Sequence, residues 1–220
     1  MEAITHFILE IAGSPWAYAV LAGLLIVDGF FPFVPGETLV VTLAVLAAGG
    51  HGPNLWLVLG VAIVASTLGD AIAFAIGRRV GVSRWNWMRR PRVARALAWA
   101  HRGFMTRPAT LMLTAKFVPV ARVAVTMTAG ATGFPVRRYL PLAFTASAVY
   151  TAFHVTVGFL AGSWLASSPL LAIAVGLVSV FVLGFIIDAI TRAVVRSRRR
   201  RATLAGGHQV ESRPLERVIG

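Results

Sequence analysis

The sequence contains no cysteine and few charged residues for its length. Only 13% of its 220 residues are Asp, Glu, Lys or Arg, whereas a soluble globular domain carries roughly 25%. The lack of cysteine excludes disulfides and thiolate metal sites. Hydrophobic residues instead make up 57% of the chain, and the mean hydropathy is +0.77. This composition is typical of a membrane protein.

Acidic residues are especially scarce, and the basic residues are clustered. Eight acids face 21 basic residues, which gives a net charge of +13. Nine arginines lie between Arg78 and Arg107, and six more lie between Arg192 and Arg201. Beside membrane spans such clusters indicate the cytoplasmic side and attract anionic headgroups. We therefore expect the membrane as a partner, and no nucleic acid.

Several motifs of enzymes and metal sites are also missing. The sequence has no GxSxG elbow, no P-loop and no HExxH pair. His51 falls in a Gly-rich turn, and His154 stands alone on an apolar helix. We expect no enzyme activity, no cofactor and no metal site.

Prolines interrupt the apolar sequence in two places. Residues 31–37 read Phe-Pro-Phe-Val-Pro-Gly-Glu, and residues 117–119 read Phe-Val-Pro. Proline removes a backbone donor, and lipid offers no replacement for the lost hydrogen bond. Broken helices are tolerated at membrane depth where they are buried in protein or line a cavity, as in transporters. The expected hairpin breaks are Pro32, Pro35, Gly36, Pro119 and Gly130.

Placing the basic segments in the cytoplasm predicts a topology, because uncharged runs such as 38–69 and 139–187 exceed the roughly 20 residues of one crossing. The expected crossing segments are 15–30, 54–77, 139–163 and 169–190. The segments 31–48 and 108–134 are expected to form re-entrant hairpins, from the outer and inner side respectively. The predicted fold class is an all-α polytopic membrane protein, an inverted repeat with two facing re-entrant helical hairpins plus crossing helices.

The same reading divides the chain into parts. We expect an N-terminal interfacial helix over 1–14, a membrane domain over 15–195 and a disordered basic cytoplasmic tail over 196–220. Within the membrane domain the expected parts are repeat one at about 15–81, a basic amphipathic cytoplasmic linker at about 82–107, repeat two at about 108–165 and a final crossing helix at about 169–195. The N-terminal residues lack the positive region of a cleaved signal peptide.

The repeat is indicated by the spacing of proline and glycine. Gly77 follows Pro35 by 42 residues, and Gly158 follows Pro119 by 39. Two such halves of opposite topology would set the hairpins tip to tip near the membrane midplane, where inverted-repeat transporters hold substrate. For the glycines alone, ordinary helix packing is the better interpretation.

These motifs together resemble the DedA family of integral membrane proteins, also described as carrying a SNARE-associated or VTT domain. The resemblance covers about residues 15–165 and rests on motifs in a fixed order: Asp28 and Glu37 around the proline-rich break, Gly69-Asp70, Lys116 to Arg122, and Ala129-Gly130 before Arg137-Arg-Tyr139. It implies facing re-entrant hairpins and movement of lipid between leaflets. For bacterial members it implies undecaprenyl phosphate as substrate, with proton coupling. One departure is Lys116, which stands where the family usually has arginine.

Arg122 is the first candidate for a binding residue. It lies three residues after Pro119, at membrane depth, where a guanidinium must meet an anion. A lipid phosphate suits its planar geometry, and Lys116 would add a second charge. The alternative is a structural ion pair between Arg122 and Glu37 or Asp70.

The carboxylates Glu37, Asp70 and Asp28 are candidates for proton coupling or for ion pairing. A carboxylate beside a cavity can bind and release a proton when substrate displaces its cationic partner. Glu37 has an alternative role as an acid near a helix N-terminus, and Asp28 could lie at the outer interface.

The sequence therefore predicts a multi-pass protein of the bacterial cytoplasmic membrane with its C-terminus in the cytoplasm. The favoured function is a proton-coupled flippase for an anionic polyprenyl phosphate used in cell-envelope synthesis. The alternatives are a less selective phospholipid scramblase, a proton-coupled small-cation exchanger and, more weakly, a membrane enzyme acting on lipid phosphates. A homo-oligomer is compatible with the sequence.

Overall fold

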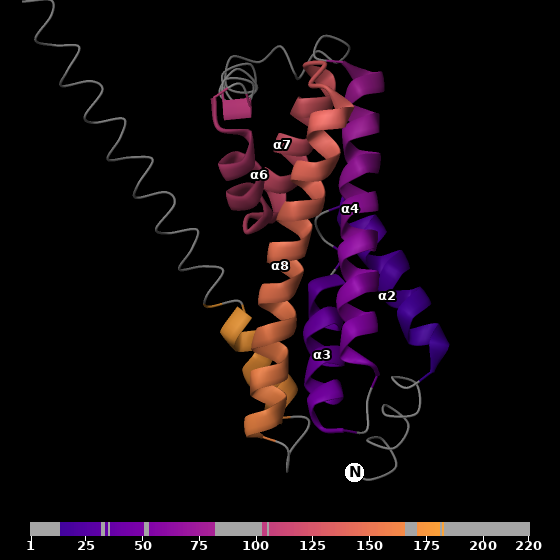
Figure 1. Ribbon diagram of the computed structural model, residues 1–220, viewed down its shortest axis with the longest axis vertical. Helices are drawn as coiled ribbons and strands as arrows, with labels where there is room; N and C mark the ends of the chain where they lie inside the picture. The colour runs from indigo at the N-terminus through magenta and orange to yellow at the C-terminus, as the bar shows by residue number, and fades with distance from the viewer. Residues whose placement is uncertain are drawn as a thin grey trace, which may run out of the picture.

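The computed structural model describes residues 14–31, 34, 36–50, 53–81, 103–104, 106–165, 171–180 and 182. All regular structure within these residues is helical (Figure 1). The elements are α2 (Pro15–Asp28), α3 (Gly36–Ala48), α4 (Leu55–Val80), α6 (Pro108–Lys116), α7 (Pro119–Ala131) and α8 (Val136–Trp164). A further apolar helix covers Leu171–Val180. The predicted all-α fold class is confirmed for this part of the chain.

Two helices are long and apolar enough to cross a bilayer. α4 has 26 residues and α8 has 29, so at 1.5 Å per residue they measure about 39 and 44 Å. Both exceed the hydrocarbon thickness of roughly 30 Å. Figure 1 shows them running along the whole length of the molecule, in opposite directions and next to each other.

Four of the shorter helices, α2, α3, α6 and α7, form two hairpins at opposite ends of this pair. α2 and α3 occupy the lower half of Figure 1, and α6 and α7 occupy the upper half. α3 packs mainly on α8, and α7 packs mainly on α4. The helix ends at both hairpin tips therefore meet near the middle of the molecule.

The first hairpin differs from its expected boundaries. Residues 15–30 were expected to cross the membrane and 31–48 to form a hairpin alone, but the hairpin consists of α2 and α3 together. The 14 residues of α2 extend only about 21 Å, and Asp28 at its end is buried. The second hairpin, α6 and α7, falls within the expected 108–134. That either hairpin is re-entrant in a bilayer stays a prediction.

Local sequence explains where the helices begin and end. Asn54 caps α4 by accepting hydrogen bonds from the backbone N–H groups of Trp56 and Leu57 at 2.9 and 3.3 Å. Prolines occupy the first position of α2, α6 and α7, where a missing N–H costs nothing. Gly81 and Gly133 follow α4 and α7 with φ of 69° and 73°, a conformation that favours glycine.

Gly77 and Gly130 bring α4 and α7 into close contact. A Cβ at Gly77 would collide with the carbonyl of Met127, and one at Gly130 would collide with the carbonyl of Phe74. Gly158 does the same between α8 and α3, because its Cβ would lie 2.8 Å from the carbonyl oxygen of Val41. Gly130 is thus helical and is not a hairpin break, which corrects the expectation. Its small size serves helix packing.

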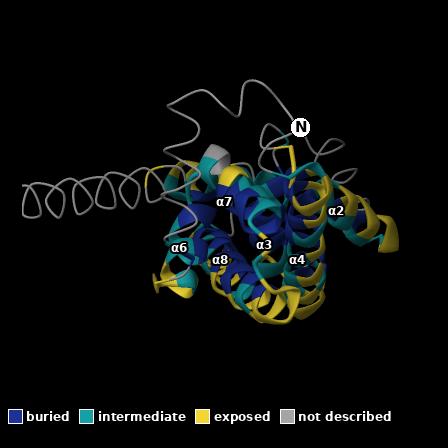
Figure 2. Cartoon of the chain, turned by 90° about the horizontal axis from the view of Figure 1, so that it is seen from above, coloured by how far each residue is buried: buried dark blue, intermediate teal, exposed yellow. Residues whose placement is uncertain are grey.

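Three apolar clusters form the core of the described residues: two larger ones, one in each half, and a smaller one of Val41, Val45, Ala161 and Ala172. The first joins α2, α3 and the start of α4, and includes Val155 of α8. The second joins α6, α7 and the start of α8, and includes Phe74 of α4. Figure 2 shows this buried interior at the centre of the bundle and the exposed residues around it. The charged site lies between the two larger clusters.

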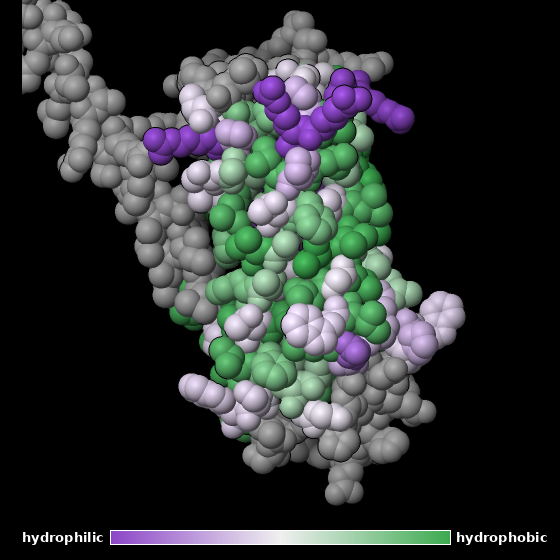
Figure 3. All heavy atoms as spheres, in the orientation of Figure 1, coloured by the Kyte–Doolittle hydropathy of each residue, from purple (hydrophilic) through white to green (hydrophobic). Residues whose placement is uncertain are grey.

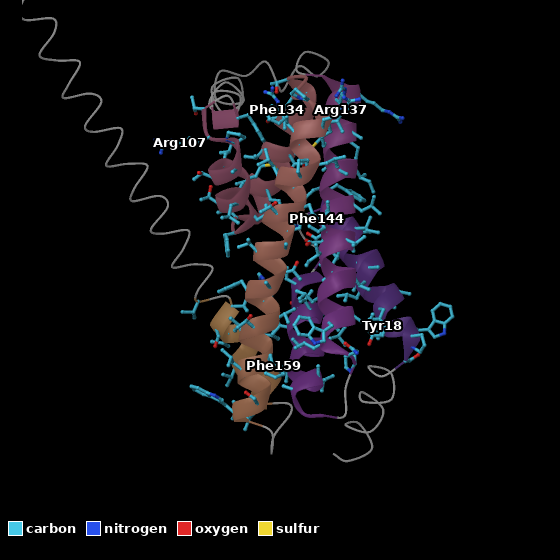
Figure 4. The ribbon with its side chains drawn as sticks, in the orientation of Figure 1. Tyr18, Arg107, Phe134, Arg137, Phe144 and Phe159 are labelled. Carbon is cyan, nitrogen blue, oxygen red and sulfur yellow. The ribbon has the colours of Figure 1, made fainter. Side chains whose placement is uncertain are left out.

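The outer surface is apolar along its length and basic at one end. Exposed apolar side chains on α4 include Val64 and Leu68, and those on α8 include Phe144 and Phe159. The exposed arginines gather at the end where α4 finishes and α8 begins, which is the purple end in Figure 3 and carries Arg107 and Arg137 in Figure 4. The positive-inside rule predicts that this end lies on the cytoplasmic side, and this orientation stays a prediction.

Candidate functional site

Arg122 makes the largest set of polar contacts at the centre of the protein. Its Nη2 lies 2.8 Å from Oδ2 of Asp28 and donates to the Asp28 carbonyl at 2.7 Å. Its Nη1 donates to Oε1 of Glu37 at 3.3 Å. Its Nε is buried and has no hydrogen-bond partner. The guanidinium is therefore paired on two sides and keeps one free donor.

The two carboxylates on Arg122 differ in exposure. The Asp28 side chain is 6% exposed, whereas that of Glu37 is 32% exposed. The longer distance also belongs to Glu37. Glu37 is therefore the weaker and more accessible of the two partners, and an incoming anion would displace it first.

Lys116 and Asp70 form a second buried ion pair. Nζ of Lys116 lies 2.8 Å from Oδ2 of Asp70 and donates to Oγ of Ser66 at 2.8 Å. Both charged side chains are at most 2% exposed. The hydroxyl of Tyr139 donates to the Asp70 backbone carbonyl at 3.2 Å, while Oδ1 of Asp70 has no hydrogen-bond partner.

Helix ends carry these charges into the middle of the bundle. Asp28 ends α2 and Lys116 ends α6, while Glu37 and Arg122 lie in the first turns of α3 and α7. The negative end of the α2 dipole favours the guanidinium of Arg122, and the positive end of α3 favours the carboxylate of Glu37. The residues Asp28, Glu37, Asp70, Lys116 and Arg122 are called the charged layer below.

A small central cavity adjoins the charged layer. Its volume is about 10 Å³, which is close to the space that one water molecule needs. Its polar lining comes from five helices: Asp28, Glu37, Ser66, Arg122, Tyr150, Thr151 and His154. Lys116 does not line this cavity, but it donates a hydrogen bond to Ser66, which does.

His154 is the residue that sequence reasoning missed. Its side chain is 3% exposed and lines the central cavity. Nδ1 lies 2.8 Å from the carbonyl oxygen of Tyr150. Because a carbonyl oxygen only accepts hydrogen bonds, Nδ1 is the protonated ring nitrogen, and Nε2 of the neutral ring is a hydrogen-bond acceptor. The signal was present in α8, where Ser147, Thr151 and His154 recur at helical spacing on one face.

The sequence-predicted residues are mostly brought together. Arg122 pairs with Glu37, which is one of the alternatives expected from sequence, but its second partner is Asp28 and not Asp70. Asp28 is buried in the charged layer, so the reading that it lies at an outer interface is wrong. Gly36 and Pro119 are the first residues of α3 and α7. Pro32 and Pro35 lie outside the described residues.

Comparison with known proteins places this architecture in a family. The sequence model of the VTT domain matches residues 34–160. An uncharacterized membrane protein of Mycobacterium tuberculosis strain CDC 1551 / Oshkosh is 34% identical over 131 residues, as is one from strain H37Rv. Each match covers 54% of this chain and 56% of the relative. The chain thus spans about half the length of these relatives.

No solved structure matches the chain significantly. The family match covers α3, α4, α6, α7 and most of α8, and therefore Glu37, Asp70, Lys116 and Arg122 of the charged layer. It begins after α2, so Asp28 lies outside the matched residues. The motif order and the helical fold agree with this match. The chain belongs to the VTT domain family, the DedA family of membrane proteins.

Proposed function

We propose that the protein is a proton-coupled flippase that moves an anionic polyprenyl phosphate across the bacterial cytoplasmic membrane, without enzymatic chemistry. Undecaprenyl phosphate, the carrier lipid of cell-envelope synthesis, is the substrate that the family resemblance implies. The observation that carries the proposal is Arg122, a buried guanidinium with a free Nε and a half-exposed carboxylate partner.

The proposed binding step is an exchange of anions on Arg122. A phosphate oxygen takes the place of Glu37 on Nη1 and forms a charge-assisted hydrogen bond with the guanidinium. Asp28 stays on Nη2 and holds the side chain in position. The released Glu37 carboxylate then takes up a proton, so that no unpaired charge is left in the bundle.

The charge balance of the layer supports one coupled proton. Three carboxyl groups, from Asp28, Glu37 and Asp70, meet two cations, from Lys116 and Arg122. If all were ionised, one negative charge would remain uncompensated in a low-dielectric setting, at considerable cost. We propose that the layer therefore holds one proton at rest, and that Glu37 binds a further one when phosphate arrives.

Alternating access is the proposed means of transport. The two hairpins make corresponding contacts: α3 packs on the long helix of the second half, and α7 packs on the long helix of the first. Gly158 and Gly77 occupy these two contacts. An inverted repeat would produce this pattern, in which the hairpin of each half packs on the long helix of the other half. The pattern supports a transport cycle in which the hairpins rock about the charged layer.

The second candidate is a small-cation exchanger or a less selective scramblase. The excess carboxylate and the orphan Oδ1 of Asp70 favour cation exchange. An exchanger would bind Na⁺ or K⁺ in competition with protons, and lipid phosphate would have no effect on it. A scramblase would move phospholipids without a pH gradient.

Proton uptake on ligand binding tests the proposal. Purified protein in weakly buffered detergent is mixed with farnesyl phosphate, and a pH indicator records the proton change. The expected result is proton uptake by the wild type, binding without uptake by Glu37→Gln, and neither by Arg122→Ala. Equal proton uptake by Glu37→Gln would overturn the exchange step. Proton release on addition of Na⁺ or K⁺, with no response to farnesyl phosphate, would favour the exchanger.

A further inference from the structure

An apolar groove runs along the seam between α4 and α8, in the half of the molecule away from the arginines. It offers about 200 Å³, and its walls include Trp56 and Leu59 of α4 with Ala152, Val155, Phe159 and Leu160 of α8. Figure 4 shows Phe159 in the lower half of α8. Trp56 and Leu160 are 77% and 49% exposed, so the groove is open to its surroundings.

Apart from the indole N–H of Trp56 and the hydroxyl of Thr156, the side chains that line the groove are apolar. Thr156 is the one lining residue with a hydroxyl, and its Oγ donates to the Ala152 carbonyl at 2.7 Å. The threonine therefore adds no unsatisfied group to the wall. A surface of this kind, in the apolar band of a membrane protein, accepts hydrocarbon and gives nothing to a headgroup.

The groove continues the seam that also borders the central cavity. Ser66 of α4 and Thr151 of α8 line the cavity, while Leu59 and Val155 of the same helices line the groove. Seven residues separate Ser66 from Leu59, or about 10 Å along the helix. A molecule with its anionic end in the cavity can thus lay an apolar chain in the groove.

We propose that the groove binds the hydrocarbon chain of the same lipid whose phosphate binds Arg122. The proposal rests on the proposed function, and it adds a site for the chain. The ligand class is a monophosphate with one long apolar tail.

The proposed role of the groove is to hold the lipid chain in one position. A chain that moves from lipid into the groove leaves one apolar setting for another, so it gains packing but little hydrophobic free energy. Its effect is to fix the direction of the tail while the headgroup exchanges with Glu37. The test must therefore measure where the chain lies and whether that position saturates.

Photocrosslinking measures both. The probe is a single-chain lipid phosphate with a diazirine about 10 Å from the phosphate, matching the Ser66 to Leu59 spacing. It is added to the protein in nanodiscs, and crosslinked peptides are identified by mass spectrometry. We expect crosslinks at 55–59 and 152–160 that excess unlabelled lipid phosphate abolishes. Val64 and Val149, which are exposed on the same two helices, serve as positions facing bulk lipid.

Variants separate the groove from the headgroup site. Ala152→Trp fills the groove and is expected to abolish the saturable crosslinks, while Val149→Trp, a similar change outside the groove, leaves them unchanged. Arg122→Ala is expected to abolish them as well, because headgroup and chain belong to one molecule.

Two outcomes contradict different parts of the account. Crosslinks spread evenly over the groove and the Val64 and Val149 positions, without saturation, would overturn the groove proposal. Saturable groove crosslinks that persist in Arg122→Ala would overturn the link to the phosphate site, showing that the groove binds a chain from another lipid. Proton uptake on farnesyl phosphate binding tests the proposed function separately.

Discussion

Individual residues decide what the centre of this protein can bind. Arg122 keeps its charge inside the bundle because Asp28 meets it with both a carboxylate and a backbone carbonyl. Glu37 adds a longer and more exposed contact. The unequal strength of these contacts is the feature that allows one partner to leave while the other holds the guanidinium.

The Lys116–Asp70 pair predicts a large stability effect. Lys116→Met leaves the Asp70 carboxylate buried without its cation, so we expect a loss of about 3 to 5 kcal/mol in unfolding free energy. The double variant Lys116→Met with Asp70→Leu removes both charges and should recover much of the loss. Equilibrium unfolding in mixed detergent micelles measures both. Arg79→Met, at an exposed position, is the control; a double variant no better than the single one would contradict the account.

Asp28 and Glu37 are predicted to have different roles: Asp28 holds the Arg122 side chain in position, and Glu37 exchanges with the lipid phosphate. Asp28→Asn weakens the fixed contact of Arg122, so we expect lower stability together with weaker binding of farnesyl phosphate. Glu37→Gln weakens the exchangeable contact, so we expect retained stability and binding of farnesyl phosphate without the proton uptake of the wild type. Equilibrium unfolding and binding titrations compare the two. Identical behaviour of both variants would contradict the different roles assigned to them.

At the scale of helices, much of the arrangement could be predicted from sequence. The uncharged runs predicted the long helices α4 and α8, and Pro119 is the first residue of α7, because hydrogen bonding in lipid leaves few alternatives. The breaks expected at Pro32 and Pro35 lie outside the described residues. The partner of each charge could not be predicted. Asp28 and Arg122 are 94 residues apart in the sequence. Their contact depends on how the two hairpins are positioned along α4 and α8, and the hydrophobic periodicity of a helix carries no information about that position. The place of His154 in the cavity could not be predicted for a similar reason, since most of the residues that line this cavity belong to other helices.

Gly130 is predicted to control the contact between α4 and α7. Gly130→Val would drive a branched side chain into the backbone of Phe74 and Arg78, so we expect a loss of about 1 to 3 kcal/mol or more from overpacking. Thermal unfolding in detergent provides the measurement. Gly60→Val is the matched control, because a Cβ at Gly60 meets nothing within 4 Å. Equal melting temperatures for the two variants would contradict the packing role.

At the scale of the whole molecule, we predict that the two ends of the bundle face opposite sides of the membrane. Arg137 and Arg138 mark one end, and Ser163 and Trp164 lie at the other end of α8. The chain has no native cysteine, so single cysteines can be introduced without a background. Arg138→Cys should react with a membrane-impermeant maleimide only after the cells are permeabilised, while Ser163→Cys should react in intact cells. The reverse pattern would contradict the assigned orientation.

The most direct test of the central claim is translocation of undecaprenyl phosphate in liposomes containing the purified protein, with and without a pH gradient. The account predicts movement that the gradient accelerates, that is lost in Arg122→Ala and that no longer responds to the gradient in Glu37→Gln. Folding of both variants is checked by helical circular dichroism. Equal movement of ordinary phospholipids without a gradient, or unchanged transport by Arg122→Ala, would contradict the claim that Arg122 carries the lipid phosphate.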